Sequence, residues 1–391
     1  MKRFDYCAML IAAALAGAPD AVRAQCDTTW EPPNGKCEGV DTRCKTDADC
    51  SGGAACVLMG VWQHDGNWSF DAPESGDIAC VPADMLAIIN DLMCTAGPRV
   101  GEYCTISGTG DLRCGECNGG TNDGEECNDD GDCPGGTCTT GTCGAVPTLA
   151  ANAKTIDAEP DSQIFVYQET TLTLHGATTS TVDGVLCAWG DNTAANVGEI
   201  IINDNHTIQG DGGQILGVNS FPHQPIIKTA SGKQLTIEPT GATNTRANSV
   251  LLIGVWDVQA DLVNDAFVIA APNQALGDNE MNLTTNDKSG SGFWIAEGDA
   301  TMIVEVEVTG AGKWELTDND NAEIRIDSPV LCVTGDVEVT KGTFHVNQAK
   351  FFTQGQLTFA PPGEIKVTGT GASASTAARA RFSGSKPGSC P

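Results

Sequence analysis

The chain has few aromatic and few basic residues, and no long apolar run after its N-terminus. Aromatic residues make up 5% of the 391 residues, and 21 Lys and Arg stand against 51 Asp and Glu. The formal net charge of −30 repels nucleic acid and anionic membranes, so neither is expected as a partner. No later segment reaches the roughly 20 apolar residues of a membrane-spanning helix, so no membrane span is expected.

Histidine is scarce as well, and the familiar catalytic motifs are missing from the sequence. The five histidines are dispersed without the spacing of metal ligands. Neither Gly-x-Ser-x-Gly nor Cys-x-x-Cys-His occurs, so a serine hydrolase and a haem attachment site are not indicated. We therefore predict no catalytic residues and no cofactor, with calcium as the one metal to consider.

The first 24 residues have the pattern of a secretory signal peptide. Met1-Lys2-Arg3 is basic, an apolar stretch runs from Cys7 to Ala18, and Val22-Arg23-Ala24 ends in a small residue. We expect cleavage after Ala24 and a secreted protein that is extracellular or attached to the cell surface.

Most cysteines lie in one part of the chain, which in an oxidising compartment predicts a disulfide framework. The framework is expected to contain Cys26, Cys37, Cys44, Cys50, Cys56, Cys80, Cys94, Cys104, Cys114, Cys117, Cys127, Cys133, Cys138 and Cys143. The mature chain has an odd number of cysteines, which leaves one thiol free or paired between chains, and Cys390 is the best candidate. The connectivity cannot be derived from the sequence.

A cysteine pattern occurs twice, at residues 44–56 and 127–138. Both copies read Cys-x5-Cys-x-Gly-Gly, a further one or two residues and Cys, with two aspartates before the middle cysteine. The pattern resembles short cysteine-rich repeats of exported bacterial proteins, and this resemblance implies no chemistry. Between the copies, apolar residues of 82–94 recur at helical spacing and predict one short helix.

From about residue 160, short runs rich in Val, Ile and Thr alternate with Gly, Asn and Asp, which predicts many short strands. The tripeptide Val-Thr-Gly recurs at 308, 333 and 367, as in an irregular solenoid. Residues 199–217 contain Asn-x-Thr-Ile-x-Gly and Gly-x-Ile-x-Gly after an apolar strand. This segment resembles an early coil of the pectin-lyase-like right-handed parallel β-helix. A β-sandwich or jelly roll is the alternative fold.

The resemblance to pectin-lyase-like proteins implies that polysaccharide lyase or hydrolase activity has to be considered. Members that cleave pectins use an arginine base with calcium, or closely spaced aspartates. Before the C-terminal tail, the predicted β-helix contains only two arginines, Arg246 and Arg325. Arg325 alternates with Ile324 and Ile326, so it is expected to face solvent. An enzyme should show a cleft in which one of these arginines meets several carboxylates.

Two further patterns allow a functional and a structural interpretation. Asp47, Asp49, Asp129, Asp130 and Asp132 are weak calcium candidates, and solvated turn aspartates beside cysteines are the simpler interpretation. Trp62 and Trp68 could stack on sugar rings, but a small disulfide-rich region also needs aromatic filling.

These observations predict an all-β protein with four segments. They are the signal peptide 1–24, a disulfide-rich region 25–145, a β-helix 146–370 and a flexible tail 371–391. The leading hypothesis is a non-enzymatic structural or adhesive protein that can self-assemble, with itself or an extracellular polysaccharide as partner. A carbohydrate-active enzyme or carbohydrate-binding protein is the alternative.

Overall fold

The computed structural model describes residues 26–33, 35–37, 43–90, 92–102, 104–106, 112–120, 126–127, 133–145, 150–190, 196–219, 223–272, 279–316, 320–369 and 372–376. This part of the chain is dominated by β-strands. Its helical elements are short 3-10 turns at Asp47–Asp49, Ser51–Gly53, Asp65–Asn67 and Arg246–Asn248.

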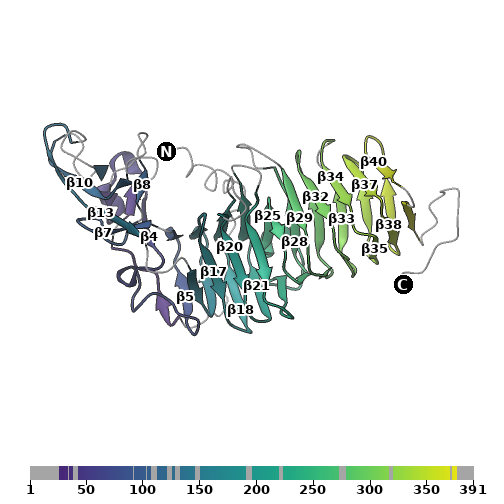
Figure 1. Ribbon diagram of the computed structural model, residues 1–391, viewed down its shortest axis with the longest axis horizontal. Coiled ribbons are helices and arrows are strands. Elements are labelled where there is room, and N and C mark those ends of the chain that lie inside the picture. Colours follow the sequence, from purple (N-terminus) through teal and green to yellow (C-terminus); the bar gives the residue numbers. More distant parts are fainter. Residues whose placement is uncertain are drawn as a thin grey trace.

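The strands wind into a parallel β-helix, as the sequence predicts (Figure 1). Most coils contribute one strand to each of three faces. Sheet A contains β1 (Thr28–Thr29), β5 (Ile78–Val81), β15 (Thr155–Ala158), β18 (Thr179–Val182), β21 (His206–Gly210), β24 (Leu235–Pro239), β27 (Leu262–Asn264) and β30 (Lys288–Ser289). Sheet D continues on from this face in the last coils with β35 (Val330–Val333), β38 (Lys350–Thr353) and β41 (Ser373–Thr376).

The other two faces both continue to the last described coil of the β-helix. Sheet B contains β4 (Cys56–Val61), β6 (Met85–Ile89), β16 (Gln163–Val166), β19 (Val185–Trp189), β22 (Gln214–Val218), β25 (Leu251–Gly254), β28 (Phe267–Ala270), β31 (Phe293–Ala296), β33 (Lys313–Leu316), β36 (Val337–Val339) and β39 (Leu357–Phe359). Sheet C contains β14 (Ala150–Ala153), β17 (Thr171–Leu174), β20 (Glu199–Ile202), β23 (Ile226–Thr229), β26 (Asp257–Val258), β29 (Glu280–Leu283), β32 (Thr301–Val304), β34 (Glu323–Ile326), β37 (Thr343–Asn347) and β40 (Glu364–Thr368).

The core is a set of apolar ladders inside the coils. In sheet B, Val268, Trp294, Trp314 and Val337 occupy successive rungs in register, and each is almost completely buried. The rings of Trp294 and Trp314 stack with centroids 5.5 Å apart. Burying an aliphatic side chain stabilises the fold by about 1.5–3 kcal/mol. Because these side chains pack against those of the adjacent coils, the stack is held together mainly by contacts between neighbouring coils.

Coil length varies along the chain, and in sheet C it is 21 residues between Ala150 and Thr171 but 31 between Ile226 and Asp257. Lys228 contacts Glu199 one coil earlier across 29 positions, whereas Asn347 contacts Asp327 across 20. This variation explains why the sequence shows no strict repeat. The first two Val-Thr-Gly tripeptides lie at equivalent corners, because the Thr334 N–H donates to the Gly310 carbonyl oxygen at 2.9 Å.

Glycine and aspartate shape the corners between sheets A and B. A Cβ atom on Gly213 would lie 1.7 Å from the Val182 carbonyl oxygen, so only glycine fits the predicted Gly-x-Ile-x-Gly corner. Carboxylates cap backbone N–H groups of the next coil, as Asp265 does for Ser291 at 2.8 Å and Asp336 does for Gln356 at 2.7 Å. Part of the acidity of the chain therefore has a structural role in the turns.

The predicted disulfide framework is confirmed, and all fourteen cysteines pair with one another. The bonds are Cys26–Cys80, Cys37–Cys50, Cys44–Cys56, Cys94–Cys114, Cys104–Cys143, Cys117–Cys133 and Cys127–Cys138. Cys114 and Cys117, the lone Cys-x-x-Cys pair, therefore bond to different partners. None of the described cysteines is a free thiol, and Cys390 lies outside the described residues.

The two copies of the cysteine pattern have one architecture. In each copy the first and third cysteines of the pattern pair, and the middle cysteine pairs with one upstream. Each copy also forms three antiparallel strands in the same order, with the earliest strand central. The first copy uses β2 (Gly35–Cys37), β3 (Arg43–Cys44) and β4, and the second uses β10 (Gly115–Asn118), β11 (Glu126–Cys127) and β12 (Thr137–Thr139).

The predicted short helix at 82–94 is wrong. Residues Met85–Ile89 form β6, and Leu92–Ala96 form β7, which pairs with β13 (Thr142–Ala145). The apparent helical spacing arises because β6 is apolar and buried on both faces, and β7 with its own apolar residues follows only three residues after its end. Ile88 and Ile89 are β-branched and fully buried, one on each side of sheet B, which favours a strand.

Strands of the disulfide-rich region also belong to the β-helix. β5 pairs in parallel with β15, and β6 pairs with β16, so sheets A and B begin well before residue 146. The second cysteine copy, β7, β13, β8 (Thr105–Ile106) and β9 (Leu112–Arg113) lie in sheets of their own at this end of the molecule (Figure 1). At the opposite end, β41 extends the fold to Thr376.

Candidate functional site

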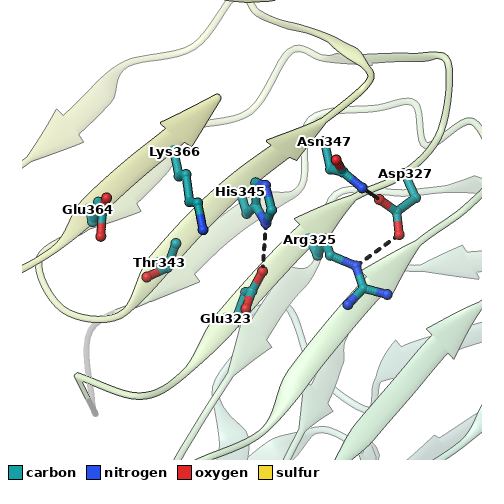
Figure 2. Close-up of a pocket in the computed structure, with 8 residues that line it drawn as sticks. All are labelled: Glu323, Arg325, Asp327, Thr343, His345, Asn347, Glu364 and Lys366. Atoms are coloured by element: carbon teal, nitrogen blue, oxygen red, sulfur yellow. Dashed lines mark hydrogen bonds and ion pairs between the residues drawn. The ribbon is translucent and has the colours of Figure 1, made fainter. Parts of the chain in front are cut away.

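The main candidate site is an open depression on the outer face of sheet C, formed by three successive coils (Figure 2). Its volume is about 470 Å³, within the range of small-molecule sites. It is lined by Glu323, Arg325, Asp327, Thr343, His345, Asn347, Glu364 and Lys366. The lining is entirely polar, which suits a polar ligand.

Strand alternation places these side chains on the outside. Ile324 and Ile326 point into the core and are fully buried, so the residues between and beside them face outward. The register then aligns Arg325 with His345 and His345 with Lys366 across three coils. Figure 2 shows these three side chains next to one another, with the carboxylates of Glu323 and Asp327 beside them.

A chain of hydrogen bonds joins the residues of the depression. Glu323 Oε1 lies 3.0 Å from His345 Nδ1, and His345 Nε2 lies 2.7 Å from Thr368 Oγ1. The Thr368 hydroxyl lies 3.1 Å from Asn347 Oδ1, and Asn347 Nδ2 donates to Asp327 Oδ1 at 2.8 Å. The polar groups are therefore held in fixed positions before any ligand arrives.

The network leaves particular groups available to a ligand. Both Asp327 oxygens are occupied, because Oδ2 accepts from Arg325 Nε at 2.8 Å. The terminal guanidinium nitrogens of Arg325 and the ammonium of Lys366 have no partner among the described residues of the depression. Glu364 likewise has no ion pair with these residues. Two cationic donors and one carboxylate are thus open.

The other arginine considered from the sequence, Arg246, does not line this depression. It lies in the turn Arg246–Asn248, forms an ion pair with Glu297 and lies 6.0 Å from the ring centroid of Phe267. Of the two predicted arginines, only Arg325 meets several carboxylates in a hollow on the β-helix.

The aspartates of the first cysteine copy shape their own loop. Asp47 Oδ1 accepts the Cys56 N–H at 2.7 Å, and Asp49 Oδ2 accepts the N–H groups of Lys45 and Thr46 at 2.8 and 3.0 Å. The hydrogen bond from Lys45, followed by that from Thr46, lowers the pKa of Asp49. These bonds support the turn interpretation, while calcium binding stays a prediction.

The second copy cannot be compared in the same way. Asp129, Asp130 and Asp132 lie outside the described residues.

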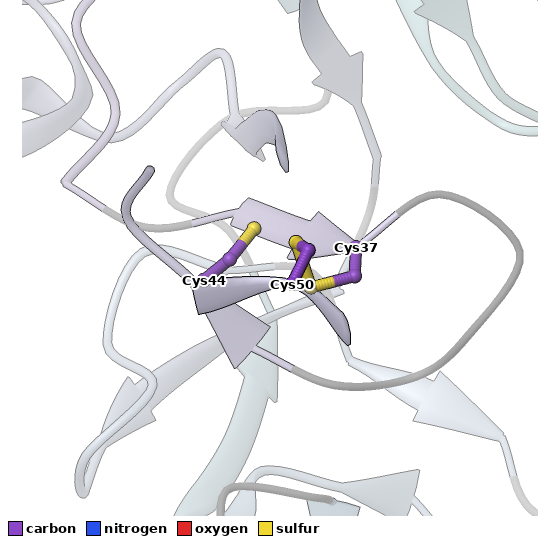
Figure 3. Close-up of side chains that lie close together, drawn as sticks. All are labelled: Cys37, Cys44 and Cys50. Carbon is purple, nitrogen blue, oxygen red and sulfur yellow. A yellow bond between two sulfur atoms is a disulfide. The ribbon is translucent and has the colours of Figure 1, made fainter. Parts of the chain in front are cut away.

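Three groups of cysteine sulfurs lie close enough to suggest a metal centre, one of which is Cys37, Cys44 and Cys50 (Figure 3). Every sulfur in these groups belongs to a disulfide, as Figure 3 shows for Cys37 and Cys50. A disulfide sulfur offers no thiolate, so these groups are structural.

The tryptophans considered as a sugar platform are buried. Trp62 and Trp68 are 1% and 5% exposed, and both belong to the main core cluster. Trp68 packs edge-on against Trp62 and Trp30, with centroids 4.7 and 4.9 Å away. They fill the first coil of the β-helix and cannot stack on a sugar.

Two buried titratable groups lie inside the β-helix rather than in the depression. Burial lowers the pKa of His206, whose Nδ1 and Nε2 contact the Gly176 carbonyl oxygen at 2.6 Å and Ser180 Oγ at 2.8 Å. Burial also lowers the pKa of Lys288 to about 8, although Asp261 and two further aspartates oppose the shift.

No family model, curated protein or solved structure matches this chain. The fold is thus established by its own topology, and no relative supplies an activity. Among the described residues, no helix is long and apolar enough to cross a membrane.

Arg325 was predicted from the sequence as a candidate, whereas its neighbours in the depression were not. The signal lay in three strands that place charged or polar residues at alternate positions, at 323–327, 343–347 and 364–368. Assigning the coil register would have been needed to bring them together, because each coil differs in length.

Proposed function

We propose that this protein is an exported, non-enzymatic adhesive protein whose last coils bind a carbohydrate that carries a carboxylate. The observation that carries the proposal is the depression on sheet C, where Arg325 and Lys366 keep donors open beside a fixed hydrogen-bond network. Seven disulfides and the N-terminal signal pattern support export. The resemblance to pectin-lyase-like proteins also supports a polysaccharide ligand.

The open groups favour this ligand class. A guanidinium pairs well with a carboxylate, because its terminal N–H groups match the two oxygens in geometry and charge. Glu364 and the outer oxygen of Glu323 can accept bonds from sugar hydroxyls. A sugar acid offers both a carboxylate and hydroxyls on one rigid ring.

The net charge of −30 does not prevent binding of an acidic sugar. At physiological ionic strength the Debye length is about 8 Å, so distant carboxylates are largely screened. The local cations, Arg325 and Lys366, then dominate the interaction.

Affinity electrophoresis and calorimetry with polygalacturonate, and with neutral dextran as comparison, test this function. We expect binding to polygalacturonate alone. Arg325→Ala and Lys366→Ala should each weaken it by about tenfold or more, the size of a lost charge-assisted hydrogen bond. Lys228→Ala is the matched control, since it removes one positive charge from sheet C in an earlier coil.

Two results would contradict the proposal. The first is equal binding to dextran and polygalacturonate. The second is an equal loss of affinity in the Lys228→Ala control.

A carbohydrate-active enzyme is the second candidate, because Arg325 meets carboxylates on one face of the β-helix. Incubation of the protein with polygalacturonate, with and without calcium, distinguishes the two. Release of unsaturated or reducing sugar ends that disappears in Arg325→Ala would establish the enzyme and overturn the non-enzymatic function.

A further inference from the structure

The last coil of the β-helix exposes both backbone edges and core side chains. β39, β40 and β41 are the final strands of their sheets. Phe359 continues the inward row that contains Val339, and Val367 continues the row of Val346. Yet Phe359 is 49% and Val367 44% exposed, whereas Val339 and Val346 are fully buried. No described strand pairs with the outer edges of β39, β40 and β41, so this end is an apolar surface rimmed by open strand edges.

The opposite end of the β-helix is built differently. There the parallel stacking of sheet B stops at β4, which pairs antiparallel with β2, and β2 pairs with β3. Disulfides link these short strands to their own loops. Among the described residues, sheet B offers no parallel edge at this end, whereas sheets A and C begin with β1 and β14 as edge strands. The last coil of another molecule could therefore not stack head-to-tail on all three sheets at once.

We propose that the exposed end of the last coil, formed by β39, β40 and β41, binds a second copy of this chain in a closed two-fold dimer. A closed symmetric interface uses the same surface twice, which is the commonest arrangement of soluble homodimers. The pairing adds one sheet edge to another, a recognised mode of β-strand association.

The geometry allows all three edges to pair at once. Two coils that meet end to end run in opposite senses around the shared axis, so every facing pair of strands is antiparallel. A two-fold axis through sheet C places β40 against its own copy, and β39 of each molecule against β41 of the other. Phe359 then lies near Ala374, a small residue that points inward in register with Phe351.

The charges of β40 complement themselves across this axis. If Ile365 lies on the axis, Glu364 of each molecule faces Lys366 of the other, which gives two cross-strand ion pairs. Opposite charges on facing strands stabilise such pairing, and like charges oppose it. The strand sequence Glu-Ile-Lys therefore specifies one antiparallel register.

Light scattering coupled to size exclusion, on the full mature chain in sugar-free buffer over a range of concentrations, tests the dimer. We expect the mass of two chains at high concentration. Lys366→Glu should weaken association by about tenfold, because two ion pairs become like-charge contacts. Combining it with Glu364→Lys should restore association, since the exchanged charges again complement one another.

Phe359→Glu should abolish dimerisation, whereas Phe70→Glu, at an apolar residue 75% exposed elsewhere, should not. Circular dichroism and thermal melts confirm that each variant folds. A monomer at every concentration would overturn the dimer, and would fit cover of this end by residues 377–391 of the same chain. Masses that grow beyond two chains, or a double variant that stays monomeric, would also overturn it. Glu364 and Lys366 also line the depression, so sugar binding is measured separately, and Phe359→Glu, which lies outside the depression, tests the dimer independently of the proposed function.

Discussion

Replacing Lys288 by methionine should change how the stability of the β-helix depends on pH. Lys288 lies at an inward position of β30, in register with Leu262, and it is completely buried. Its ammonium donates to the carbonyl oxygens of Thr284, at 3.0 Å, and Asn286. Burial lowers its pKa from 10.5 to about 8, which corresponds to about 3 kcal/mol between the charged and neutral forms.

The sign of the effect follows from proton uptake. Below pH 8 the folded and unfolded states both hold the proton of Lys288, and well above pH 10.5 neither does. Between these values the unfolded state holds more protons, so the stability of the unaltered protein rises with pH in that window. Lys288→Met lacks this rise. Its stability relative to the unaltered protein should therefore fall by about 3 kcal/mol from pH 7 to above pH 10.5.

Urea unfolding followed by tryptophan fluorescence at both pH values measures the difference. Effects that do not depend on pH, such as the two carbonyl groups left without their donor, cancel in the comparison. Lys228→Met, at an exposed lysine paired with Glu199, is the control for loss of one positive charge. If Lys288→Met and the unaltered protein keep the same difference at both pH values, the fold does not desolvate this ammonium and the reasoning is refuted.

Three further outcomes are expected from the core and the disulfides. Trp314→Ala should lower the free energy of unfolding by about 3–5 kcal/mol in urea titrations, and a loss below 1 kcal/mol would contradict the stacked core. Because burial lowers the pKa of His206, stability should decrease as the pH falls below 6.5, and His206→Asn should show a smaller decrease in thermal melts across that range. Replacing both cysteines of the Cys26–Cys80 bridge, which spans 54 residues, by serine should cost about 4 kcal/mol, against about 3 for the 11-residue Cys127–Cys138 bridge. The larger cost is expected for the longer loop, because its disulfide removes more entropy from the unfolded chain, and equal costs would contradict this explanation.

The β-helix was predictable because its local signals agree with the global fold. β-branched residues mark the strands, and Gly213 marks a corner where only glycine fits. The helix expected at 82–94 was wrong because the apolar residues of two short, closely spaced strands, β6 and β7, imitate a helical period. Residue propensities over so short a segment do not distinguish one helix from two strands. The parallel pairing of β6 with β4 and β16 shows that the segment forms strands.

The candidate site was much less predictable. Arg325 was recognisable as an outward residue, but its partners His345 and Lys366 come from later coils at intervals that no strict repeat defines. Contacts of this kind depend on register, which arises from corner geometry and from core packing together. The disulfide connectivity could not be predicted from the sequence either, because fourteen cysteines allow very many pairings.

The depression of sheet C is the proposed binding place of an acidic sugar. A crystal structure of the mature protein with an oligogalacturonate tests this directly. The sugar carboxylate should lie within hydrogen-bonding distance of the terminal guanidinium nitrogens of Arg325 and of Lys366 Nζ. An oligosaccharide bound at another surface, with this depression empty, would contradict the proposed function.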